Sequence, residues 1–251
     1  MIIAVGSWRG VGATTTALLV AVGLASADEA GAWLIEADPA GGALAGRMQF
    51  PGHTIGGLER VAFPTERGTP TEAFEAVAHA VAGLRVVTSP ADPFRAFSCH
   101  QPRMPWAAAV RDLPGSVVVD VGRLRAGSPI GALLAQVDTL LVVSSPEISA
   151  AVSAAEWLQA GGRVSPTEPG LPDGKARLVF VESPGGIAFP RTTLTAELGD
   201  QCAGWLPWDA PTVDLVHRGA SATDRRVRRS PLAGAVNQLV LGLTLDQVGV
   251  R

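Results

Sequence analysis

The sequence predicts an α/β fold: a doubly wound, mainly parallel sheet with helices on both faces. Short apolar runs with the composition of buried strands alternate with helical segments at close spacing along the 251 residues. Three of these runs end at glycines or aspartates, as strands do at the ligand-binding edge of an open parallel sheet. We find no internal repeat and no convincing linker, so we expect residues 1–251 to form a single domain.

The candidate strands are short runs rich in Val, Ile, Leu and Ala, bounded by turn residues. They span residues 2–5, 32–38, 84–88, 116–120, 140–143, 176–181 and 204–207. The candidate helices span residues 17–22, 71–82, 106–113, 147–160, 194–198 and 232–243. The strands and helices follow one another through most of the chain, which supports the doubly wound sheet.

Two stretches, 47–70 and 91–105, are irregular, and we assign them no chemistry. The second contains Cys99 and His100 side by side, a pairing that invites a metal site. No matching ligands stand near them in the sequence, which favours an ordinary loop.

Composition excludes several classes of protein. The chain is 47% hydrophobic and 17% charged, so it should bury a substantial core, and its net charge of −3 gives no overall attraction to nucleic acid. Two distant cysteines indicate a reducing compartment, and no run approaches the length of a membrane span. The apolar N-terminus has no basic flank and is typical of a strand rather than a signal peptide. We therefore expect a cytoplasmic protein with no transmembrane segment.

The first turn, residues 6–16, is the most informative stretch. It is rich in glycine, follows an apolar run and leads into a helix with three threonines at its start. Backbone N–H groups in such a turn bind phosphate, and the glycines let the anion approach. A phosphate loop also needs Lys before its first Thr, and that position is Ala13. Lys175 is the only lysine in the sequence and lies in a predicted surface loop.

Three features converge on one edge of the predicted sheet, and together they match the needs of a nucleoside triphosphatase. The loop provides donors for phosphate, and Thr14 provides a hydroxyl for Mg²⁺. Asp120 would hold the metal through its water shell, and Asp38 would orient the attacking water as a catalytic residue. Each aspartate taken alone is as consistent with a structural cap as with a site residue.

The sequence resembles the ParA/MinD family of P-loop ATPases along nearly its whole length. The family loop Lys-Gly-Gly-x-Gly-Lys-Thr-Thr aligns with residues 8–15, and segments 34–41, 117–120 and 138–147 resemble later family motifs. Residues 206–209 resemble the family turn near adenine. The resemblance implies a P-loop NTPase fold of the MinD/ParA type and these nucleotide-binding residues: Arg9, Gly10, Val11, Gly12, Ala13, Thr14, Thr15, Pro207 and Asp209.

Both family lysines are replaced, the signature lysine by Trp8 and the loop lysine by Ala13. Arg9 stands where the family has glycine and offers a cation at a different place in the turn. The asparagine that reads adenine in the family is missing from residues 180–184. This degenerate loop is most similar to the divergent TadZ/CpaE branch and to actinobacterial septum-site-determining proteins. Loss of the lysine predicts weak or absent binding of ATP and Mg²⁺ and weak or absent hydrolysis.

The leading hypothesis is a pseudo-ATPase that forms a homodimer and acts as a localisation or regulatory factor. The resemblance implies a protein partner in a pilus, secretion, septum or chromosome-positioning complex, and recruitment to a pole, septum or membrane complex through that partner. The alternative is a slow, functional ATP-dependent dimerisation switch with Mg-ATP hydrolysis. A ligase similar to dethiobiotin synthetase ranks last, because such enzymes also need the loop lysine.

Two further segments have weaker signals. Arg225–Arg229 is a basic cluster that could contact nucleic-acid phosphates, although the pattern favours a solvated loop or helix start. Residues 242–251 carry one arginine and no basic face, so they do not predict a membrane-binding helix.

Overall fold

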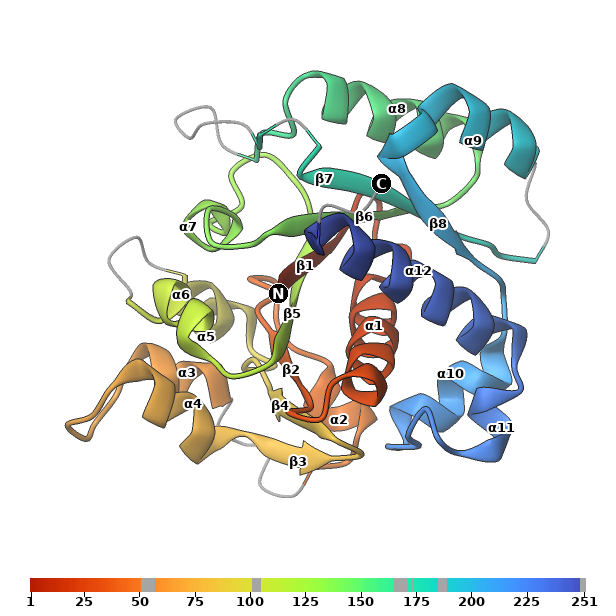
Figure 1. Cartoon of the computed structure of the whole chain (residues 1–251). Helices are drawn as coiled ribbons and strands as arrows, with labels where there is room; N and C mark the ends of the chain where they lie inside the picture. The colour runs from red at the N-terminus through yellow and green to blue at the C-terminus, as the bar shows by residue number, and fades with distance from the viewer. Residues whose placement is uncertain (51–56, 101–104, 165–170, 173, 185–188, 249–251) are drawn as a thin grey trace.

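A computed structural model describes residues 1–50, 57–100, 105–164, 171–172, 174–184 and 189–248. Within these residues, eight strands form one sheet in the order β3-β4-β2-β5-β1-β6-β7-β8 (Figure 1). All neighbouring strands are parallel except β3 and β4. The strands are β1 (Ile2–Ser7), β2 (Ala32–Glu36), β3 (His79–Val81), β4 (Leu84–Val87), β5 (Ser116–Arg123), β6 (Thr139–Ser144), β7 (Ala176–Val181) and β8 (Cys202–Leu206). The predicted fold class is confirmed.

Helices cover both faces of this sheet. One face carries α1 (Ala13–Ala27), α2 (Leu44–Arg47), α10 (Ala210–His217), α11 (Arg225–Arg228) and α12 (Pro231–Val248). The other carries α3 (Gly57–Ala62), α4 (Pro70–Val77), α6 (Trp106–Ala109), α7 (Gly131–Leu134), α8 (Ile148–Gln159) and α9 (Arg191–Leu198). The short helix α5 (Pro93–Ser98) follows β4 in the sequence. Figure 1 shows α12 running alongside α1, against which it packs.

The core forms two layers because the central strands are apolar on both sides. In β1, Ile3 and Val5 pack under α1 and α12, whereas Ile2 and Ala4 point into the opposite layer. Period-two alternation sends successive side chains to opposite faces, and a strand covered on both faces is therefore apolar throughout. Because these central strands are buried on both faces, the ends of β1, β2 and β5 are held in fixed positions. The candidate site is built on those ends.

The helix that we predicted over residues 71–82 is wrong in its second half. The helix α4 ends at Val77, and residues 79–81 form the antiparallel edge strand β3. A two-residue turn with positive φ at Ala82 (50°) and Gly83 (83°) joins β3 to β4. That geometry is typical of a tight β-hairpin turn, and pairing with β4 overrides the helical period of the sequence.

Several other boundaries differ from the prediction. The irregular stretch 91–105 contains α5, whose start is capped by Asp92, and the chain forms a further helix, α10, that we did not predict. The predicted helix over 106–113 is α6 followed by a 3₁₀ turn. In the same region His100 is buried with its ring edge-on to Trp106, at 5.6 Å between centroids.

Candidate functional site

The phosphate-type loop connects β1 to α1. Gly10 and Gly12 have φ values of 77° and 103°, and Gly12 is the N-cap of α1. Only glycine adopts these values without strain. The Ser7 hydroxyl accepts a hydrogen bond from the Val11 N–H at 2.7 Å, which closes the turn. The loop therefore has the backbone form expected of an anion-binding turn at a helix N-terminus.

Behind this loop lies a buried carboxylate. Asp120 on β5 is completely buried, and its Oδ1 accepts a hydrogen bond from the Gly122 N–H at 3.0 Å. Burial raises the pKa of Asp120 to about 7, nearby Glu36 and Asp38 add to the rise, and a hydrogen bond from Thr14 opposes it. Oδ2 has no hydrogen-bond partner among the described residues.

These features fit a Mg²⁺ ion held through water beside Thr14. A buried carboxylate oxygen without a partner, next to a hydroxyl and other carboxylates, is stabilised by a cation or its water shell. Thr14 and Asp120 would hold the ion, which would neutralise phosphate charge when bound. Ala13, between Gly12 and Thr14, is 6% exposed and brings no charge to the loop.

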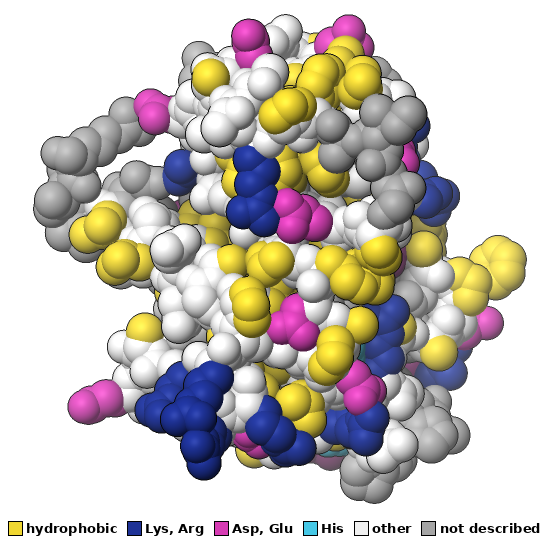
Figure 2. Space-filling view, turned by 90° about the vertical axis from the view of Figure 1, so that its right-hand side faces the viewer, with side chains coloured by type: hydrophobic (Ala, Val, Ile, Leu, Met, Phe, Trp, Pro, Cys, Tyr) yellow, Lys and Arg dark blue, Asp and Glu magenta, His cyan; other side chains and the backbone are white. Residues whose placement is uncertain are grey.

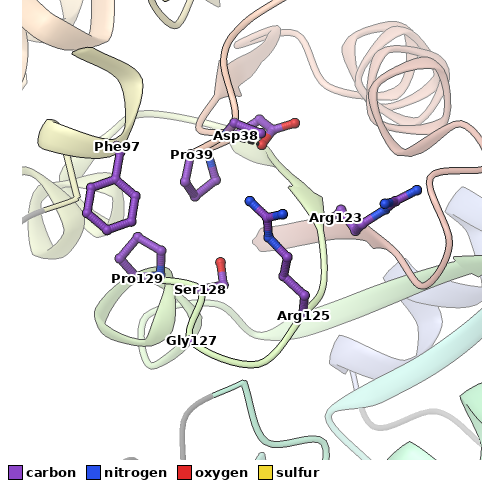
Figure 3. A pocket seen from close by; sticks show the side chains of 9 residues that line it. Asp38, Pro39, Phe97, Arg123, Arg125, Gly127, Ser128 and Pro129 are labelled. Carbon is purple, nitrogen blue, oxygen red and sulfur yellow. Dashed lines mark hydrogen bonds between the residues drawn. The ribbon is translucent and has the colours of Figure 1, made fainter. Parts of the chain in front are cut away.

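Asp38 lies on the other side of β5. Its carboxylate is half-buried and accepts a hydrogen bond from the Ala40 N–H at 2.8 Å. Burial raises the pKa of Asp38, and the charges of Arg125 and Arg123 oppose the rise. Asp38 borders a cavity of about 200 Å³ together with both arginines (Figure 3). A Cβ atom on Gly122 would lie 2.1 Å from the Asp38 carboxyl carbon, so this close approach requires glycine.

Glu36 is a residue whose importance the sequence did not reveal. It stands opposite Asp120 in the register of β2 and β5 and is buried. Its carboxylate accepts hydrogen bonds from the N–H groups of Ala43, Leu44 and Ser89, at 2.5, 2.8 and 3.0 Å. Glu36 thereby ties the segment after β2 to the end of β4. It has a structural role that positions Asp38.

Trp8 and Arg9 both point toward α8. The Trp8 indole N–H donates to the Ser153 hydroxyl at 2.8 Å, and its ring packs on Trp157 at 5.2 Å between centroids. Arg9 is exposed and reaches the Ser149 hydroxyl at 3.4 Å. The side chain at the signature-lysine position is therefore held by a helix of its own chain.

Arg123 is a second residue that sequence reasoning missed. It is the last residue of β5, and its guanidinium donates to the Arg9 carbonyl at 2.9 Å. A Cβ atom on Gly10 would lie 2.6 Å from Arg123 Nη2, which places this cation against the phosphate loop. The signal in the sequence was an arginine three residues after Asp120, which ends the predicted strand 116–120.

A larger cavity of about 960 Å³ opens on the opposite side of the loop. Its lining includes Val11, Gly12, Thr15, Pro207 and Asp209, so it brings the two predicted nucleotide segments together. Its size and mainly apolar lining suit a nucleoside.

Two side chains of this cavity are already engaged within the chain. The Asp209 carboxylate caps α10 by accepting from the Thr212 N–H and hydroxyl at 3.1 and 2.7 Å. The Thr15 hydroxyl lies 3.2 Å from His217 Nε2. Asp209 therefore shapes the wall of the cavity, and its carboxylate oxygens are both occupied.

The basic cluster lies away from the loop. Arg225, Arg226, Arg228 and Arg229 are exposed on and after α11, and Arg226 pairs with Asp224 at 3.1 Å. Figure 2 shows Lys and Arg side chains gathered in the lower part of the face that it presents. Among the described helices, none is long and apolar enough to cross a membrane.

No protein-family model and no curated protein sequence matches this chain. Solved structures do. A ParA family ATPase from Chlorobium tepidum has a TM-score of 0.71 at 16% identity, covering 96% of this chain and 98% of that one. The cell division ATPase MinD from Pyrococcus furiosus has 0.71 at 15%, covering 97% and 98%. The septum site-determining protein MinD from Pyrococcus horikoshii, complexed with Mg-ADP, has 0.67 at 14%, covering 99% and 98%. The chain therefore has the fold of the ParA and MinD ATPases.

Proposed function

We propose that the chain is a ParA/MinD-like positioning or regulatory factor that binds Mg-ATP in a lysine-free loop and hydrolyses it little or not at all. The observation that carries this proposal is the buried Asp120 carboxylate beside Thr14, in a loop whose lysine position is the buried Ala13. Thr14 and Asp120 would supply the groups that hold the metal, whereas the loop lysine that stabilises transferring phosphoryl groups is absent.

The cavity on the other side of the loop supports nucleotide binding. Its two predicted segments meet around a volume large enough for a base and ribose, next to the glycines that would receive the phosphates. Glu182 and Ser183 line the place where the family has its adenine-reading asparagine. Glu182 is paired with Arg191 at 2.7 Å, so its carboxylate is already engaged.

A second copy of this chain is the occupant that we propose for the face around the loop. Exposed apolar side chains lie on α5 and in the first half of α8: Phe94, Phe97, Ile148 and Val152, at 83%, 48%, 48% and 46% exposure. Phe97 also borders the cavity of Asp38. Dimerisation would place this face against a partner loop, and Trp8 would stay bound to α8. As functional counterparts we propose the TadZ/CpaE-type factors of pilus, secretion or septum complexes.

Phosphate release from ATP tests the lack of hydrolysis. We expect the wild-type protein to release phosphate far more slowly than an Ala13→Lys variant, which restores the missing cation. Equal rates for the two proteins would contradict the proposal, because the lysine position would then be irrelevant to turnover.

The second candidate is a slow ATP-dependent dimerisation switch, favoured by the position of Asp38 at a cavity next to the loop. In a switch, Asp38→Ala and Asp120→Ala should change nucleotide-dependent dimerisation and cellular localisation. If both variants localise and dimerise as the wild type does, this candidate is excluded.

A further inference from the structure

We infer that Arg123 is the cation that binds the phosphate chain of a nucleoside triphosphate in this loop, in place of the missing lysine. The inference rests on the proposed function, since it names the residue that would compensate for Ala13. A phosphate chain carries several negative charges, and Asp38 and Glu36 lie near enough to Asp120 to interact with it, so three carboxyl groups gather near the loop. A site with this charge needs a positive group beyond backbone N–H donors and one metal ion.

Lys175 cannot supply that charge. It precedes β7, and its carbonyl accepts from the Leu140 N–H near the start of β6. The loop follows the C-terminal end of β1, which is parallel to β6. Lys175 lies at the N-terminal ends of these strands, on the opposite side of the sheet from the loop. The cation must therefore be an arginine or a histidine.

The end of β5 brings Arg123 to the loop. The register between β1 and β5 shifts after Val5, so Val121 is an extra residue, and Arg123 stands opposite Ser7, where the loop begins. From there its guanidinium reaches the Arg9 carbonyl and lies against Gly10, as the distances above show. The side chain is thus held on the loop backbone, with several of its five N–H donors left for a ligand.

Four other arginines near the loop have different surroundings. Arg47 and Arg218 line the larger cavity, where Arg218 pairs with Asp214. Arg9 points to α8, whereas Figure 3 shows Arg125 projecting into the cavity of Asp38 and Arg123 projecting away from it. Neither Arg123 nor Arg125 forms an ion pair within the described part of the chain. The charge of Arg123 is therefore available, and guanidinium geometry suits bidentate contact with phosphate oxygens.

Calorimetric titration with Mg-ATP and with inorganic triphosphate tests this role. Arg85→Ala is the matched control, because Arg85 also donates to a backbone carbonyl, that of Ala30 at 3.1 Å, but stands near the start of β4. We expect Arg123→Ala to weaken both ligands about 10- to 100-fold, the range of one or two charge-assisted hydrogen bonds. Arg85→Ala should bind as the wild type does. Adding Ala13→Lys to Arg123→Ala should restore affinity.

The outcomes separate the two proposals. If the wild type binds both ligands and Arg123→Ala binds them as tightly as Arg85→Ala does, the role of Arg123 is overturned and nucleotide binding stands. If the wild type binds triphosphate through Arg123 but not ATP, the cation role stands and the nucleotide proposal fails. If the wild type binds neither ligand at millimolar concentration, both are overturned. Circular dichroism of each variant confirms that it is folded.

Discussion

The two neighbouring carboxylates Glu36 and Asp120 differ in how many hydrogen bonds the fold provides for them. Glu36 satisfies three backbone N–H groups, whereas Asp120 leaves one oxygen without a partner among the described residues. Burial raises the pKa of both. Burial therefore destabilises the ionised form of both carboxylates, and the three backbone hydrogen bonds of Glu36 offset part of that cost. Retaining the strained Asp120 carboxylate is typical of a functional group rather than of a structural one.

Asp120→Asn should stabilise the ligand-free protein at pH 8. The pKa of Asp120 is about 7 in the folded chain and near 4 when unfolded, so the folded state binds more protons between pH 4 and 7. The free energy of unfolding therefore decreases as the pH rises through that range, by at most about 4 kcal/mol. Urea unfolding at pH 5 and pH 8 should show the variant's advantage growing with pH. An equal difference at both pH values would contradict this prediction.

Glu36→Gln is the matched variant, and we expect it to destabilise the protein. The new amide would turn a donor toward the N–H of Ser89 or of Ala43 and Leu44, and leave a buried donor unsatisfied. We expect a loss of about 1–3 kcal/mol in the free energy of unfolding. A stabilised Glu36→Gln protein would show that Glu36 does not hold the segment after β2.

At the scale of elements, the sequence revealed strand cores well, and strand ends and side-chain directions poorly. The predicted cores of β1, β2 and β5 are correct, because strands covered on both faces are apolar throughout. Their C-terminal ends differ from the prediction by two or three residues, at Ser7, Glu36 and Arg123. The edge strand β3 was missed, since residues 78–81 continue the helical period of α4. Arg123 was missed for another reason: the extra residue in β5 sets its position, and no local pattern marks that register shift.

His100 gives a pH-dependent test of the segment around α5 and α6. Burial lowers its pKa to about 4, so between pH 6.5 and pH 4 the unfolded chain binds more protons, and stability is lost as the pH falls through this range. His100→Phe keeps a ring beside Trp106 and removes this titration. Between pH 7 and pH 4 we expect the variant to lose about 3 kcal/mol less stability than the wild type. If the free energies of unfolding of the two proteins changed equally with pH across this range, the lowered pKa of His100 would be contradicted.

At the scale of the whole molecule, the loop, two cavities and an exposed apolar rim share one edge of the sheet. The rim includes Phe94 and Phe97 on α5, and Ile148 and Val152 on α8. Large apolar side chains grouped in this way mark contact surfaces. The sequence predicted a homodimer only through family resemblance, because the positions of exposed apolar side chains on the surface depend on how the helices are arranged in space.

Phe94→Ser should abolish ATP-dependent dimerisation without unfolding the chain. Phe94 is 83% exposed, so its truncation removes little intramolecular packing. Leu241→Ser, at 59% exposure on α12, is a matched control that should dimerise normally. Sedimentation velocity with and without Mg-ATP distinguishes them. A monomeric Leu241→Ser protein together with a dimeric Phe94→Ser protein would place the interface on α12 instead.

We expect the loop to bind nucleotide although it has no lysine. Calorimetric titration of ATP and ADP into the wild-type protein, with and without Mg²⁺, alongside light scattering, tests it most directly. We predict Mg²⁺-dependent ATP binding in the micromolar range, coupled to a change from monomer to dimer. The absence of any binding at millimolar nucleotide would contradict the account and make this chain a scaffold whose loop is purely structural.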